Sequence, residues 1–249
     1  MMLGLAGLFA IVALVYASVG FGGGSTYTAL LALWGVDYRL IPVIALICNI
    51  IVVTGGSIRF VRAGLVSWPQ IYPLLLISAP LAFLGGLVPL KQVVFLTILG
   101  SALLASAIAL LLQADKMAPR AVSKPLLFCI SGGVGLLAGL SGIGGGIFMA
   151  PVLHLIRWAE ARRIAAFASL YILINSAAGL LGQILKSGPQ ALAEPAMQYG
   201  LLLGAVLVGG QLGSLFGMRY LSPRLLRSLT AILVGYAAVR LLWQAYTSG

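Results

Sequence analysis

The sequence predicts an all-α integral membrane protein built from two inverted repeats. Of its 249 residues, 61% are hydrophobic and only 8% are charged, whereas a soluble domain carries about a quarter charged residues. Apolar runs of about 20 residues, long enough to cross the hydrocarbon core of a bilayer, recur along the chain. A glycine-rich motif also occurs twice at equivalent places, which indicates a duplicated chain.

The positions of the charges support a membrane protein. Fifteen Lys and Arg against four Asp and Glu give a net charge of +11, which can indicate nucleic-acid binding. Here the basic residues fall in short gaps between apolar runs and form no stripe that could follow a phosphate backbone. Because loop Lys and Arg orient membrane proteins, we expect the chain to lie in a lipid bilayer and to bind no nucleic acid.

Six uninterrupted apolar runs predict full-length membrane helices, over residues 40–61, 70–90, 93–113, 164–185, 197–218 and 225–246. Two other apolar regions, 2–35 and 125–158, are broken by glycine. The segment after each break is about a dozen residues long, or roughly 18 Å as a helix, which is too short to cross comfortably. We expect each region to be a glycine-tipped hairpin or a broken helix.

The glycine breaks indicate an internal duplication. The segments Gly20 to Gly24 and Gly142 to Gly146 are identical except at one position, where Phe21 aligns with Ile143. Further along, Asn49 falls opposite Asn175, so the two halves stay in step. We therefore predict a first transmembrane repeat and a second one, over residues 1–115 and 116–249.

The loop charges favour an inverted relation between the repeats. If each broken region enters and leaves on one face, each repeat adds three further crossings and the second repeat lies upside down. One face then collects 11 basic residues and the other collects four: Arg59, Arg62, Lys116, Arg120, Lys124, Arg157, Arg162, Arg163, Arg219, Arg224 and Arg227 against Arg39, Lys91, Lys186 and Arg240.

The alternative is that each broken region crosses the membrane once. The repeats would then be parallel and the same charges would divide eight against seven, with no orienting bias. We prefer the inverted arrangement, with both termini in the periplasm of a bacterial inner membrane.

The glycine segments are the first candidates for a binding site. In the hairpin arrangement both lie near mid-membrane, each before a short helix whose N-terminus points free N–H groups and a positive dipole end inward. Glycine tolerates positive φ and puts no side chain between amide and ligand. We expect a small anionic substrate there, bound by Gly22, Gly23, Gly24, Ser25, Gly144, Gly145 and Gly146. The alternative is that the glycines only permit a tight bend or close helix packing.

Buried amides extend this predicted site. Asn49 and Asn175 fall near the midplane, roughly 14 and 21 Å along helices that start from opposite faces. An amide can donate an N–H to an anion without adding negative charge, although it can also simply hold two helices together. Gln211 is placed in the same cavity, with further residues that more often bond their own backbone: Thr26, Thr54, Ser57, Ser141 and Gln183.

The titratable residues argue against cation transport and catalysis. All four acidic residues fall in expected loops: Asp37, Asp115, Glu160 and Glu194. The membrane interior therefore has no carboxylate to carry a proton or bind a metal ion. We expect no metal, no cofactor and no enzymatic activity, because no nucleophile is paired with a base. His154 is the only simple candidate for a proton carrier, and a packed or interfacial histidine is the simpler interpretation.

Other glycines and arginines have a simpler interpretation. Gly209, Gly213 and Gly217 recur every four residues, as do Gly135 and Gly139, and small residues at this spacing let helix backbones approach closely. Their expected role is packing. The basic pair at the end of the run over residues 40–61, Arg59 and Arg62, is interpreted as a cytoplasmic anchor, with Arg59 close enough to the apolar run to attract anions toward a cytoplasmic vestibule.

The duplicated motif resembles that of a known transporter family. The segment Gly144-Gly145-Gly146-Ile147-Phe148-Met149-Ala150-Pro151, the chain length, the duplication and the small-residue helix from Gly209 to Gly217 are similar to the TauE/SafE family of sulfite and organosulfonate exporters. The first copy departs from the pattern, with Ala29 where the second has Pro151. The resemblance implies export of a small sulfur oxyanion such as sulfite or sulfoacetate.

Two other functions stay open at this point. The same scaffold can take up or conduct another small anion or a sulfur compound, or it can be a membrane scaffold without cargo. A motif specifies a scaffold better than it specifies a substrate. The sequence leaves the anion, the coupling ion and homo-oligomer formation open.

Overall fold

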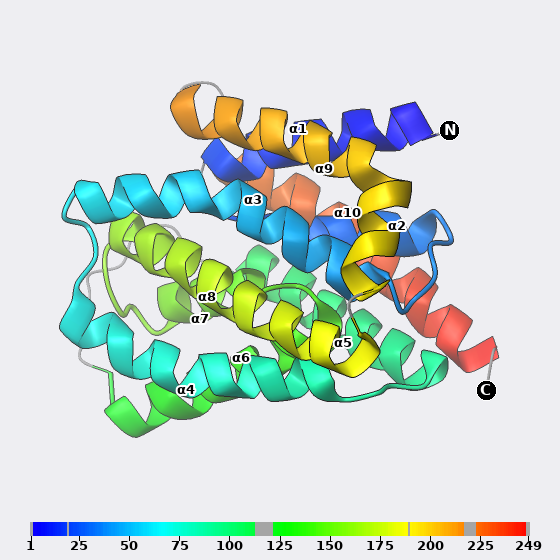
Figure 1. The fold of residues 1–249 in the computed structure, drawn as a ribbon. Helices are drawn as coiled ribbons and strands as arrows, with labels where there is room; N and C mark the ends of the chain where they lie inside the picture. The colour runs from blue at the N-terminus through cyan, green and yellow to red at the C-terminus, as the bar shows by residue number, and fades with distance from the viewer. Residues whose placement is uncertain (1, 19, 113–121, 189, 217–222, 248–249) are drawn as a thin grey trace.

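A computed structural model describes residues 2–18, 20–112, 122–188, 190–216 and 223–247. These residues form ten helices and no strand (Figure 1), which confirms the expected all-α class. The helices are α1 (Met2–Ser18), α2 (Gly24–Leu33), α3 (Ile41–Arg62), α4 (Trp68–Leu87), α5 (Gln92–Leu112), α6 (Lys124–Ser141), α7 (Gly146–Leu155), α8 (Ala161–Ser187), α9 (Gln190–Phe216) and α10 (Pro223–Thr247).

Six of these helices are long and apolar enough to cross a membrane: α3, α4, α5, α6, α8 and α9. Helix α6 was expected as part of a glycine-broken region, yet its 18 residues reach the length of a span. Many large apolar side chains face outward, among them Leu3, Ile11 and Leu215 with 78%, 62% and 70% of their surface exposed. Apolar surface on this scale suits lipid and not water, so the chain is a multi-pass membrane protein.

The described helices form two series with the same order of elements, α1 to α5 and α6 to α10. In each series the first helix is followed by a helix of 10 residues, α2 or α7, and then by three helices of at least 20 residues. Helix α9 is bent at Tyr199, where the backbone leaves helical geometry.

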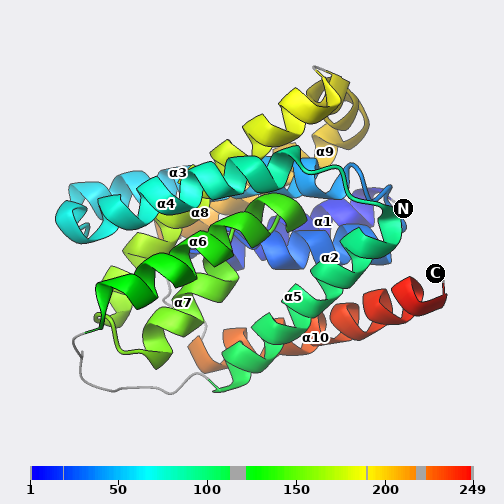
Figure 2. The ribbon, with the colours of Figure 1, turned by 90° about the horizontal axis from the view of Figure 1, so that it is seen from below.

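The two series pack against each other with exchanged roles. Helix α1 packs on α9 and α6 packs on α4, while α9 contacts α3 and α4 contacts α8. Helix α2 lies against α10, and α7 against α5. The pairs α3 with α8 and α5 with α10 join equivalent helices (Figures 1 and 2). Each of these contacts thus has a counterpart in which the two series are exchanged.

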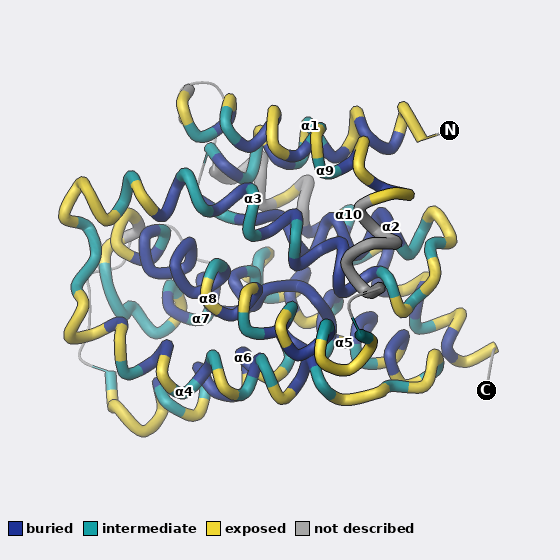
Figure 3. The backbone as a smooth tube through the Cα atoms, viewed as in Figure 1, coloured by how far each residue is buried: buried dark blue, intermediate teal, exposed yellow. Residues whose placement is uncertain are grey.

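The ends of the elements gather on two sides of the molecule. In Figure 1 the beginning of α1, the end of α2 and the end of α10 lie on the right, whereas the end of α3 and the beginnings of α4 and α6 lie on the left. Helices α3 and α8 form the central pair, with 67% and 61% of their most apolar stretch buried, against 39% for α4 and 33% for α9 (Figure 3).

The regularly spaced glycines lie where two helices approach closely. A methyl group added at Gly213 would overlap the backbone of α1 at Leu14, and one at Gly139 would overlap the backbone of α4 at Ala82. Two further glycines make the same kind of contact, Gly209 and Gly135. These contacts support the packing interpretation, and Gly217 lies outside the described residues.

Candidate functional site

Each glycine break is a turn that depends on left-handed backbone geometry. Gly23 and Gly145 both have a φ of 82° and directly precede the short helices α2 and α7. An L side chain is strained at such a φ. A Cβ at Gly23 would face Val12 and Tyr27 within its own repeat, so this glycine shapes the turn and does not face the other break.

The two breaks meet at the side chain of Asn49. Its Nδ2 donates a hydrogen bond of 3.0 Å to the carbonyl oxygen of Ile143, between the glycines of the second break. A Cβ on Gly22 would lie 2.5 Å from Asn49 Oδ1, and one on Gly24 would lie 2.5 Å from Asn49 Nδ2. Glycine is therefore required on the first turn to admit the amide that joins it to the second.

Five buried side-chain oxygens among the described residues have no hydrogen-bond partner within the protein: Ser25 Oγ, Tyr27 Oη, Asn49 Oδ1, Asn175 Oδ1 and Ser176 Oγ. Their residues are at most 1% exposed. Asn49 Oδ1 and Ser176 Oγ lie 2.5 and 2.7 Å from the positions that a Cβ on Gly22 and on Gly144 would take, and Ser25 directly follows Gly24, so these three border the turns. Leaving one such buried group unpaired costs about 1 to 3 kcal/mol, so these oxygens mark a candidate polar site.

Both short helices begin directly after the glycine turns, so their N-terminal backbone donors lie next to these turns. The first intrahelical bonds are made by the amides of Thr26 in α2 and Phe148 in α7, which donate to the glycine carbonyls of the turns. The N–H groups of the first two residues of each helix precede these bonds: Gly24, Ser25, Gly146 and Ile147. They carry the positive ends of the two helix dipoles, and such an end binds oxyanions.

Each of the two asparagines uses one N–H group within the protein. The expectation that both amides donate to an anion concerns the other N–H group of each. In the structure Asn49 donates to the other break, and Asn175 Nδ2 donates to the Tyr171 carbonyl of its own helix at 2.8 Å. Each NH₂ group retains a second N–H, and each Oδ1 atom is left without a partner. The amides therefore offer the site both an acceptor and a donor.

Two predicted residues lie away from this junction. Gln211, on α9, borders Gly55, and the buried, unpartnered Nη2 of Arg59 approaches the same glycine. His154 lies in the last turn of α7, at the opposite end from Gly145, and is partly exposed. Gly146, in contrast, borders the junction through Ile172 of α8.

The remaining polar candidates bond within the helix bundle. Thr54 and Ser141 donate to carbonyls of their own helices, as hydroxyls in membrane helices commonly do. Three others join different helices, through the pairs Thr26 with Tyr16, Ser57 with Ser169, and Gln183 with the Gly139 carbonyl.

Sequence patterns alone did not identify Ser176 or the Ile143 carbonyl as parts of this junction. Ser176 directly follows Asn175, so a search for polar neighbours of the paired asparagines finds it. The role of Ile143 depends on a contact between residues 94 positions apart, for which the sequence contains no signal.

Comparisons with known proteins agree with the helical membrane architecture. Residues 4–241 match the family described as sulfite exporter TauE/SafE. The chain is 36% identical over 247 residues to "Probable membrane transporter protein y4hK" of Sinorhizobium fredii, covering 97% of this chain and 98% of that protein. It is 31% identical over 113 residues to a "Probable membrane transporter protein" of Haemophilus influenzae, covering 43% and 41%. No solved structure matches the chain at a significant level.

Proposed function

The chain belongs to the sulfite exporter TauE/SafE family, and on this premise we propose that it exports a small sulfur oxyanion, such as sulfite or a small organosulfonate. Family membership makes it a membrane transporter. The observation that carries the finer proposal is that unpartnered buried oxygens of Ser25, Asn49 and Ser176 lie beside the two glycine turns. Four backbone N–H groups at helix N-termini lie next to the same turns.

The donors and acceptors beside the two turns suit an oxyanion that a transporter must bind and then release. The amides of Gly24 and Ser25 and the hydroxyls of Ser25 and Ser176 supply donors. The Oδ1 atoms of Asn49 and Asn175 accept the hydroxyl of a protonated form such as hydrogensulfite, or an ordered water. All of these groups are neutral, so they bind the anion without the full charge that would hinder its release.

Export also agrees with the electrical gradient of a bacterial cell. In the proposed arrangement the repeats are inverted, the chain lies in the inner membrane, and both termini face the periplasm. Moving one negative charge out of an inside-negative cell is favoured by about 2.3 kcal/mol per 100 mV. Efflux of an oxyanion therefore requires no coupling ion.

We expect reporter fusions to place the ends of the chain in the periplasm. Alkaline phosphatase fused after Gly249 should be active, and a cytoplasmic fluorescent reporter should be active when inserted at Arg120, because basic residues collect on the cytoplasmic side. Both positions lie outside the described residues. Cytoplasmic activity of the reporter at Gly249 would contradict the inverted repeats.

Replacing either asparagine with leucine should weaken anion binding. At Asn49 or Asn175 the change removes a hydrogen bond to a charged group, worth about 1.5 to 3 kcal/mol, which corresponds to roughly 10- to 150-fold in affinity. Aspartate should be worse than leucine, because it brings a carboxylate beside the anion.

The measurement is the anion affinity of the purified variants, with their thermal stability in the absence of ligand as the control. Lower affinity at both positions, with no more loss of stability than the Asn49 bond to the Ile143 carbonyl and the Asn175 bond to the Tyr171 carbonyl explain, supports the site. Unchanged affinity with lower stability would assign both asparagines to helix packing and favour a scaffold without cargo.

A further inference from the structure

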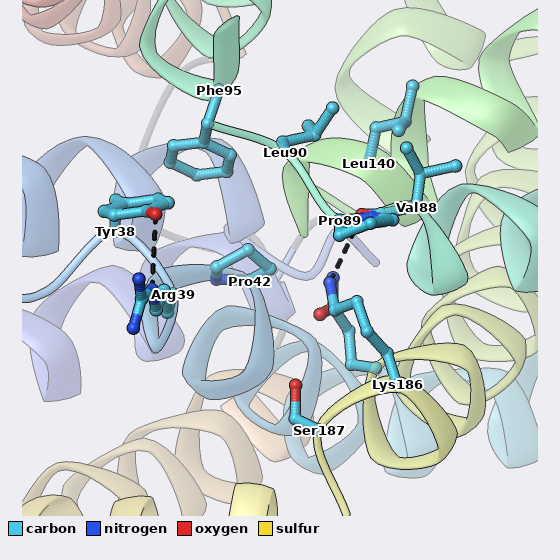
Figure 4. A pocket seen from close by; sticks show the side chains of 11 residues that line it. Tyr38, Arg39, Pro42, Val88, Pro89, Leu90, Phe95, Leu140, Lys186 and Ser187 are labelled. Carbon is cyan, nitrogen blue, oxygen red and sulfur yellow. Dashed lines mark hydrogen bonds between the residues drawn. The ribbon is translucent and has the colours of Figure 1, made fainter. Parts of the chain in front are cut away.

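A pocket of about 320 Å³ opens where residues of both series meet (Figure 4). The loop between α2 and α3 contributes Tyr38 and Arg39, the end of α8 contributes Lys186 and Ser187, and the segment between α4 and α5 forms a third wall. A cavity of this size has room for a small oxyanion. The sequence analysis assigned Arg39 and Lys186 only to the loops of the face with four basic residues.

The pocket is positively charged. Arg39 and Lys186 line it, and no acidic residue is among the described residues of its wall. Arg39 Nε donates a hydrogen bond of 3.2 Å to the Tyr38 hydroxyl, and the guanidinium carbon lies 5.5 Å from the centre of the Tyr38 ring. This contact raises the pKa of Arg39, so the guanidinium stays charged. Lys186 Nζ donates to the Val88 carbonyl at 3.4 Å.

Neutral oxygens thus accept the side-chain hydrogen bonds of both cations. The nearest carboxylate in sequence, Asp37, accepts a bond from the backbone N–H of Arg39, and its charge also raises the pKa of Arg39, but it is absent from the wall of the pocket. Gln183 and Ser187 add an amide and a hydroxyl to the lining. Two cations beside neutral donors can bind an anion through charge-assisted hydrogen bonds.

The base of the pocket adjoins the second glycine turn. Pro42 and Leu140 line the pocket, and a Cβ on Gly142 would overlap the backbone of Pro42. Gly142 begins the turn whose Ile143 carbonyl accepts the Asn49 amide. The pocket and the junction of the two turns are therefore linked by a few neighbouring residues.

We propose that this pocket is a vestibule that binds small oxyanions through Arg39 and Lys186 at one end of the transport path. The proposal rests on the proposed function and adds a second, peripheral site for the same class of anion. In the proposed arrangement this pocket opens toward the periplasm, so its cations receive the anion that leaves the neutral junction between the turns. The junction performs the selection.

Charge-selective alkylation tests the vestibule in the absence of transport. Ser187→Cys is introduced into a Cys129→Ser background, because Cys129 is exposed and Cys48 is buried. The rates of reaction with anionic iodoacetate and neutral iodoacetamide are then compared for the detergent-purified protein. We divide the rate with iodoacetate by the rate with iodoacetamide. At low ionic strength this ratio should be about fivefold lower in the Arg39→Gln/Lys186→Gln double variant than in the background protein. In 1 M salt the ratios of the two proteins should become nearly equal.

Arg240→Gln is the matched control, since it removes an exposed cation that does not line the pocket. It should leave the ratio unchanged. Ethanesulfonate, which does not react with thiols, should slow both reagents in the background protein and lose this protection in the double variant. An equal ratio in all proteins, or no protection by ethanesulfonate, would overturn the vestibule.

The same experiment separates this inference from the proposed function. Asn49→Leu should impair transport and leave the alkylation ratio of the introduced thiol unchanged, because Asn49 does not line the pocket. If the ratio responds to the two cations but the protein carries no sulfur oxyanion into vesicles, only the proposed function fails. If transport is observed and the ratio does not respond, only the vestibule fails.

Discussion

Alanine in place of Gly24 should reduce anion affinity and transport by about 5- to 150-fold. Its Cβ would overlap the Ile143 carbonyl and lie 2.5 Å from Asn49 Nδ2, so the bond that joins the two turns could not form. Each hydrogen bond to the anion that the displaced turn can no longer make costs about 1 to 3 kcal/mol of binding free energy, which corresponds to this range of affinity. The measurements are the affinity of the purified protein and the transport of radiolabelled sulfite into inside-out vesicles.

Gly133→Ala is the matched control, because Gly133 lies within α6 and a Cβ there meets no atom within 4 Å. Alanine at that position should leave affinity and transport unchanged and should slightly favour the helix. Transport at the wild-type rate by Gly24→Ala would show that the glycines only permit a bend. A ligand-free melting temperature close to that of the wild type, together with lost affinity, would assign the effect to the site.

Leucine in place of Gly213 should have the opposite effect and prevent stable folding. The new Cβ alone would overlap the carbonyl oxygen of Leu14, so α1 and α9 would have to separate along their contact. Overpacking of this kind costs about 1 to 3 kcal/mol and occasionally more, which is a large share of the roughly 5 to 15 kcal/mol that stabilises a typical protein. The measurement is the yield and melting temperature of the detergent-purified protein.

Gly204→Leu controls for leucine on the same helix, because a Cβ at Gly204 meets no atom within 4 Å. This variant should purify and melt like the wild type. Normal stability of Gly213→Leu would mean that the small residues of α9 are not needed for its contact with α1.

Most of the helices could be predicted because the length of an apolar run is set by the bilayer. The run at 40–61 corresponds to Ile41–Arg62, and the run at 93–113 corresponds to Gln92–Leu112. The boundaries of α9 were less accurate, since this helix begins at Gln190, seven residues before the apolar run, and bends at Tyr199. Polar residues at a helix end extend the helix without changing the hydrophobic signal.

The different structural roles of the glycines could not be predicted from the sequence. Gly23 and Gly24 are neighbouring glycines of one motif. Gly23 has a φ of 82° and contacts its own repeat, whereas Gly24 contacts Asn49 and the other turn. That difference depends on the tertiary contact between the two breaks. The sequence also placed Asn175 beside Asn49 by the repeat, while its bond to the Tyr171 carbonyl depends on the rotamer that packing selects.

The most direct test of the central claim is to locate a bound anion. Selenite is a close analogue of sulfite, and its selenium gives an anomalous signal in crystals of the protein. We expect an anomalous peak between the turns, with selenite oxygens about 3 Å from the Ser25 and Ser176 hydroxyls, and loss of this peak in Gly24→Ala. A selenite peak only at the pocket of Arg39 and Lys186, or no peak in a protein that binds selenite in solution, would contradict a central site formed by the two glycine turns.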